Sequence, residues 1–180
     1  MKSLKKIVVA TDLSETSRRG LRYACALASD QKAALMVLHV ANEFTAREYY
    51  PEEFAFAAVA GQTWPRDRIL AEASLDLIHF LQQNLESMKP IPLVTRRVVF
   101  GPVARGIAAV ATEEKADLIV ISPRRHNGLR RLFGGSITAN VTRLSPCPVL
   151  AVTSPLPSRL RRHRWLSNGF GWPRERATAI

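Results

Sequence analysis

The stretch that decides the fold is residues 117–152, DLIVISPRRHNGLRRLFGGSITANVTRLSPCPVLAV. Leu118–Ile121 is an apolar run that is too short for a helix and typical of a buried strand. A basic loop follows it, and Gly134-Gly135-Ser136 then opens a segment with apolar residues at helical spacing. Two prolines end this helix, and Val149–Val152 has the composition of a second strand.

The glycine pair and serine at residues 134–136 form a predicted anion site. At a helix N-terminus, free backbone N–H groups and the positive end of the helix dipole face the same ligand. The stretch is therefore interpreted as a strand, a loop, a phosphate-type helix start and a second strand.

The rest of the chain continues the alternation of strands and helices. Apolar runs predict strands at Lys6–Ala10 and Ala34–Val40. Val94–Phe100 alternates, with Arg96 and Arg97 inside it, and predicts a further strand. Helical spacing predicts one helix ending near Asp30, one ending by Pro90, one starting after Gly101-Pro102 and one from Ser136. This order indicates a Rossmann-like α/β fold, with a five-stranded parallel sheet covered by helices on both faces.

Composition places the chain in the class of ordinary globular α/β proteins. It has 180 residues, of which 47% are hydrophobic and 23% charged. The longest apolar run, Phe54–Ala60, is far shorter than the roughly 18 residues of a membrane span. Two distant cysteines, Cys25 and Cys147, indicate a reducing compartment rather than a disulfide framework. We therefore expect a cytoplasmic protein that is not bound to a membrane.

The positive charge is concentrated at the C-terminus. The net charge is +11, and residues 155–180 contain six arginines and one glutamate. We expect a domain over residues 1–154 and a basic, disordered tail over residues 155–180. The charge favours contact with a polyanion, and the alternative is a solvated tail on a mildly basic domain.

Two loops should flank a ligand crevice. In an open parallel sheet, ligands bind beyond the carboxyl ends of the strands where the strand order reverses. Thr11-Asp12 follows the first strand and Ser122–Arg125 follows the fourth. Asp12 is placed either to accept hydrogen bonds from ribose hydroxyls or to cap the first helix.

Over residues 4–153 the chain resembles the universal stress protein family. The shared motifs are a first strand followed by Thr-Asp, Leu38-His39-Val40, Gly101-Pro102, an Asp-Leu-Ile-Val strand, and Gly-Ser-Ile-Thr before Cys-Pro-Val-Leu. The resemblance implies an adenine-nucleotide alpha-hydrolase-like fold with strand order 3-2-1-4-5, and a homodimer paired through Val149–Val152. It also implies a nucleotide crevice formed by Ala10, Thr11, Asp12, Val40, Ser122, Arg125, Gly135, Ser136, Ile137 and Thr138.

The chain departs from the ATP-binding branch of that family at two glycines. That branch carries G-x-x-G-x(9)-G-[ST] after the fourth strand, and here the three glycine positions are Ser122, Arg125 and Gly135. Glycine permits positive φ and a close approach of phosphate to the backbone, which Arg125 does not. We therefore predict that ATP binds weakly or not at all. The alternative is that side chains such as Arg125 hold a nucleotide or another anion.

Little in the sequence indicates catalysis. The four histidines lie on separate elements without metal-ligand spacing, and His39 is expected to be a packed strand-end residue. Ser136 has no base partner near it in sequence, and no Walker A or G-x-G-x-x-G motif is present. We expect a non-catalytic stress-response regulator with a degenerate nucleotide crevice. Two alternatives stay open: a nucleic-acid- or anion-binding protein acting through its arginine loop and tail, and a weak ATPase.

Overall fold

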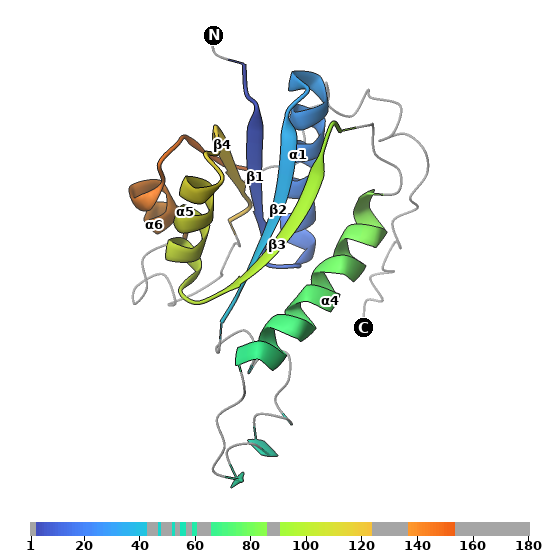
Figure 1. The fold of residues 1–180 in the computed structure, drawn as a ribbon, viewed down its shortest axis with the longest axis vertical. Coiled ribbons are helices and arrows are strands. Elements are labelled where there is room, and N and C mark those ends of the chain that lie inside the picture. The colour runs from blue at the N-terminus through green and yellow to red at the C-terminus, as the bar shows by residue number, and fades with distance from the viewer. Residues whose placement is uncertain are drawn as a thin grey trace, which may run out of the picture.

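Strands and helices alternate along the chain as the sequence predicts (Figure 1). The computed structural model describes residues 3–42, 66–85, 91–123 and 137–153, together with Arg47, Glu52, Ala55, Phe56, Val59 and Ala60. The elements are β1 (Lys6–Thr11), α1 (Glu15–Gln31), β2 (Ala34–Ala41), α4 (Arg66–Leu85), β3 (Val94–Phe100), α5 (Val103–Glu113), β4 (Leu118–Ile121), α6 (Ile137–Leu144) and β5 (Val149–Ala151). Each predicted strand is confirmed to within one residue at each end.

The five strands form one parallel sheet in the order β3-β2-β1-β4-β5. The chain builds the sheet outward from β1 to β3, then returns to the other side of β1 for β4 and β5. The strand order therefore reverses between β1 and β4, which is where open sheets of this kind hold ligands. This is the adenine-nucleotide alpha-hydrolase-like fold, and the predicted order 3-2-1-4-5 is confirmed.

Alternate residues of the strands point into two separate cores. One core lies under α1 and α4 and contains Ile7, Val9, Leu21, Leu35, Leu77 and Val120. The other lies under α5 and α6, the helices in front of the sheet in Figure 1, and contains Val8, Leu38, Ile107, Ile119 and Val141. Burial of both faces explains why β1, β2 and β4 are apolar without alternation. Among the described ranges, no helix has the length and apolar character needed to cross a membrane.

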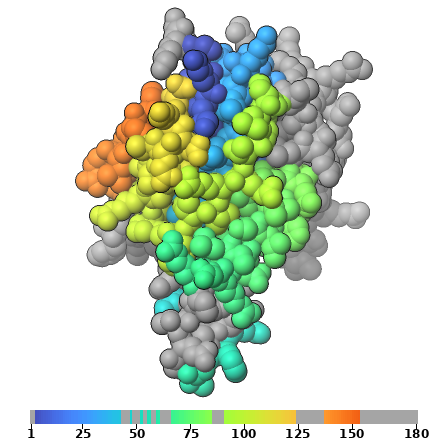
Figure 2. Space-filling view, in the orientation of Figure 1, coloured from blue at the N-terminus to red at the C-terminus, as the bar shows by residue number. Residues whose placement is uncertain are grey.

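Two apolar side chains between β2 and α4 are exposed. Phe56 and Val59, which the structure describes within residues 47–60, are 76% and 90% exposed. The described residues of this stretch, drawn in teal, project beyond the rest of the molecule in Figure 2. The apolar island that the sequence places at residues 54–59 therefore does not contribute Phe56 or Val59 to either core.

The two edges of the sheet differ in charge. On the edge strand β3, Arg96 is exposed and Arg97 forms ion pairs with Glu113 at 2.6 Å and Glu114 at 3.5 Å. A hydrogen bond from Lys6 and the charges of Lys6 and Arg97 lower the pKa of Glu114. Charged side chains on an edge strand oppose pairing with another chain. The opposite edge strand, β5, has the apolar sequence Val149–Ala151.

The end of α1 offers a stabilising substitution. Lys32 is exposed and left-handed, with φ of 54°, and its N–H contacts the carbonyl oxygens of Ala28 and Ser29. Glycine adopts this conformation without strain, so Lys32→Gly should raise the unfolding free energy by about 0.5–1 kcal/mol. The matched control is Gln31→Gly, within the helix, which should lower it by a similar amount. Urea denaturation measures both, and a loss of stability in Lys32→Gly would contradict the prediction.

Candidate functional site

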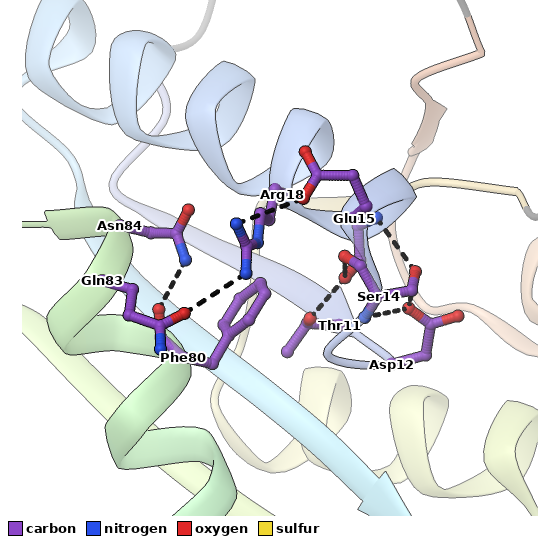
Figure 3. A network of polar contacts seen from close by, with 9 residues as sticks. Thr11, Asp12, Ser14, Glu15, Arg18, Phe80, Gln83 and Asn84 are labelled. Carbon is purple, nitrogen blue, oxygen red and sulfur yellow. Dashed lines mark hydrogen bonds and ion pairs between the residues drawn. The ribbon is translucent and has the colours of Figure 1, made fainter. Parts of the chain in front are cut away.

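The loop after β1 is held by its own polar side chains (Figure 3). Ser14 is the N-cap of α1, and its hydroxyl accepts a hydrogen bond from the Ser17 N–H at 3.3 Å. The Asp12 carboxylate accepts hydrogen bonds from both the N–H, at 3.1 Å, and the hydroxyl of Ser14. The alternative that Asp12 caps the helix is therefore wrong, because Ser14 is the N-cap. Asp12 instead holds Ser14 in place through these two hydrogen bonds.

Thr11 ties this loop to α1 and to β2. Its hydroxyl lies 2.8 Å from that of Ser17 and accepts a hydrogen bond from the Leu13 N–H at 3.0 Å. Leu13 has φ of 63°, a conformation that is rare for a bulky residue. The Thr11 carbonyl lies 2.9 Å from Nδ1 of His39, which is buried. His39 is thus the packed strand-end residue that the sequence predicts, and it fixes the strand end that carries the site.

Ser122 lies beyond the end of β4 and packs against α1. Its Oγ is buried and, within the described part of the chain, has no hydrogen-bond partner. A Cβ atom added to Gly20 would lie 2.3 Å from this oxygen. Helix α1 therefore approaches the loop after β4 at Gly20, and only glycine at this position leaves room for the Ser122 side chain. Gly20 was not predicted from sequence, because nothing local to residues 15–31 marks it as a contact.

Some of the predicted site residues lie together at the carboxyl ends of the strands. Ala10, Thr11, Asp12, Val40 and Ser122 lie at or just beyond the carboxyl ends of β1, β2 and β4, which are neighbours in the sheet. Ile137, which is 54% exposed, and the half-buried Thr138 begin α6. The remaining three, Arg125, Gly135 and Ser136, lie outside the described residues.

The cysteines are not activated nucleophiles. Burial raises the pKa of Cys25 to about 12. Burial also raises the pKa of Cys147, which lies beside Ser145 just before β5. Thiolates are the reactive form, so the surroundings of both cysteines disfavour that form. Across the described ranges, no three His, Cys, Asp or Glu residues are grouped so that they could bind a metal.

His39 should make stability depend on pH. Burial lowers its pKa below the usual 6.5, against the opposing effects of the Thr11 hydrogen bond, Asp12 and Asp76. As the pH falls below 6.5, His39 takes up a proton more readily in the unfolded chain than in the folded chain. The contribution of His39 to the unfolding free energy is therefore complete above pH 6.5 and decreases as the pH falls below it. His39→Asn should make the loss of unfolding free energy between pH 7.5 and 5.5 less steep. His79→Asn, on the exposed side of α4, should keep the wild-type slope. Equal slopes in all three proteins would contradict the prediction.

The chain is similar in sequence and in fold to known proteins of one family. The model of the universal stress protein family matches residues 3–153. Universal stress protein YxiE of Bacillus subtilis is 31% identical over 155 residues, covering 82% of this chain and 97% of that protein. Among solved structures, UspA from Lactobacillus plantarum aligns with a TM-score of 0.61 at 22% identity, over 84% of this chain and 99% of that one. A universal stress protein in complex with cAMP aligns with a TM-score of 0.55 at 24% identity, over 86% of this chain and all of that one. Because the family model covers most of the sequence, this chain belongs to the universal stress protein family.

Proposed function

We propose that the protein is a non-catalytic regulator whose crevice, between the loops after β1 and β4, binds adenine nucleotides weakly. The proposal rests on the packing of the Ser122 side chain against Gly20. Ser122 occupies a position that is glycine in the ATP-binding motif. The crevice therefore keeps its place in the fold while its phosphate loop has changed. The cAMP complex of a structurally similar protein supports a nucleotide as the ligand class.

In this proposal, Asp12 recognises the ribose. A carboxylate offers about four acceptor sites, and the two hydrogen bonds from Ser14 use part of this capacity. Ribose hydroxyls are donors that match a carboxylate at the mouth of the crevice. The start of α6 supplies backbone N–H groups of the kind that bind phosphate.

Binding is weak because two glycine positions are filled. A residue other than glycine at 122 or 125 lacks the freedom to adopt positive φ, which glycine uses to bring its backbone close to a phosphate. Arg125 adds positive charge near the crevice but does not allow the close backbone approach that a glycine allows. The raised pKa values of both thiols, including that of Cys25 at about 12, argue against either cysteine as a catalytic nucleophile. Both cysteines are free, which fits a reducing compartment such as the cytoplasm. A polyanion-binding role for residues 155–180 stays a prediction, because this tail lies outside the described residues.

An ATP titration of the full chain, followed by amide chemical shifts, tests this function. We expect shifts at Asp12 and Ser122 that saturate only at millimolar ATP, which corresponds to about 4 kcal/mol of binding free energy. Asp12→Asn should abolish the shifts, whereas Asp30→Asn, at the exposed far end of α1, should not. Phosphate release should stay at the uncatalysed level. Tight magnesium-dependent binding, ATP turnover, or shifts elsewhere in the molecule would overturn the proposal.

A further inference from the structure

Arg18 joins the first turn of α1 to α4. Its Nη1 lies 3.1 Å from the Glu15 carboxylate, and its Nη2 donates a hydrogen bond to Oε1 of Gln83 at 3.2 Å. The guanidinium also lies over the ring of Phe80, 5.9 Å from its centre. Figure 3 shows this side chain reaching from α1 to the end of α4. Phe80 is itself buried in the core under both helices, so the contact has a rigid base.

The same turn of α1 carries the groups that hold Asp12. The Ser14 carbonyl accepts hydrogen bonds from the Arg18 N–H at 3.2 Å and from the Ser17 hydroxyl at 2.8 Å. Ser14 in turn donates two hydrogen bonds to the Asp12 carboxylate. Arg18 therefore belongs to the same hydrogen-bonded unit as the carboxylate of the crevice, although it does not contact that carboxylate directly.

Arginine is a costly way to join these helices. A cation in the first turns of a helix opposes the helix dipole, and Arg18 is the fourth residue of α1. Its Nε is buried and has no hydrogen-bond partner within the described part of the chain. A buried donor without a partner is unfavourable, and an apolar side chain would pack on Phe80 without either cost. The guanidinium must therefore do something that packing alone does not.

We propose that Arg18 is a positioning residue for the crevice. By bonding to Glu15 and Gln83 together, it fixes the first turn of α1 against α4, and that turn presents Asp12 to the ribose hydroxyls. Thr11 and Ser17 fix the turn against the sheet, so Arg18 supplies the restraint toward α4. The inference rests on the proposed function, since it assigns a role at the same crevice.

The ribose hydroxyls provide the test. NMR titration gives the ratio of dissociation constants for 2′,3′-dideoxy-AMP and AMP, which isolates the hydroxyl contribution. In the wild-type chain the ratio should be about tenfold, the value of one charge-assisted hydrogen bond. It should fall to about threefold or less in Arg18→Met and in Gln83→Met. Arg19→Met, the same substitution on the exposed neighbour, should leave it at the wild-type value.

The outcomes separate the inference from the proposed function. A wild-type ratio near one would remove the ribose contact from the proposed function, and the inference with it. A tenfold ratio that persists in the folded Arg18→Met and Gln83→Met proteins would overturn the inference alone. A purely structural role would lower the melting temperature without changing the ratio. If Arg18→Met does not fold, Gln83→Met decides, because Gln83 is exposed and its substitution removes only the α4 end of the contact.

Discussion

Gly20→Ala is expected to lower the unfolding free energy by about 1–3 kcal/mol, although alanine is the better helix former. The reason is the 2.3 Å approach between the added Cβ and the Ser122 hydroxyl, which forces the helix or the serine to move. In a Ser122→Gly background this overlap is gone, and Gly20→Ala should instead stabilise the protein by up to about 1 kcal/mol through helix propensity.

A double-mutant cycle in urea measures the coupling between the two residues. We expect an interaction energy of about 1–4 kcal/mol, the difference between the effects of Gly20→Ala in the two backgrounds; residues in contact typically couple by about 0.5–3 kcal/mol. Gly106→Ala is the matched control, because its added Cβ would contact Val40 and Val99 rather than Ser122. Its effect should add to that of Ser122→Gly without coupling. Additive behaviour of Gly20→Ala and Ser122→Gly would show that the two positions are not complementary.

We propose that the protein forms a homodimer through β5, so Ala151→Pro is expected to leave it monomeric. The Val152 N–H donates to the Ile121 carbonyl and the Pro148 carbonyl accepts from Ile119, so these residues of the β5 segment face β4. In a parallel ladder the intervening residues point the other way, which directs the N–H groups of Val149 and Ala151 to the open edge. The sequence of this edge strand is apolar. A second copy of β5 would satisfy these groups.

Sedimentation at tens of micromolar protein distinguishes the two states. Ala151→Pro removes an outward donor and leaves the bonds to β4 intact, so the variant should stay folded as a monomer. Ala151→Val keeps the N–H with similar bulk and should remain a dimer. A wild-type monomer, or a proline variant that dimerises as tightly as the wild type, would contradict this interface.

The elements were predictable because their signals are local. Apolar runs such as Ala34–Val40 and Leu118–Ile121 mark strands directly, and their alternation with helices restricts the sheet order. Position in the sheet also brings Thr11-Asp12 near Ser122, since β1 and β4 are adjacent. The strand ends of the candidate site therefore follow from topology.

The contacts that shape the site were not predictable, because they join residues far apart in sequence. Nothing near Gly20 indicates that it faces Ser122, and nothing near Arg18 indicates that it reaches Gln83 and Phe80. The capping role was also ambiguous, because Asp12 and Ser14 are both good capping residues and only the geometry separates them.

Calorimetry at one salt concentration can compare the ATP affinity of the Ser122→Gly, Arg125→Gly chain with that of the wild-type chain. This comparison tests whether the shape of the phosphate loop limits ATP binding. Restoring both glycines returns the phosphate loop to the shape of the ATP-binding motif. The double variant should therefore bind ATP at least about tenfold more tightly than the wild type. This gain corresponds to the free energy of about one hydrogen bond to phosphate. Weaker binding by the double variant would contradict the account, because it would show that Arg125 holds the phosphate and that the loop was never limited by its shape.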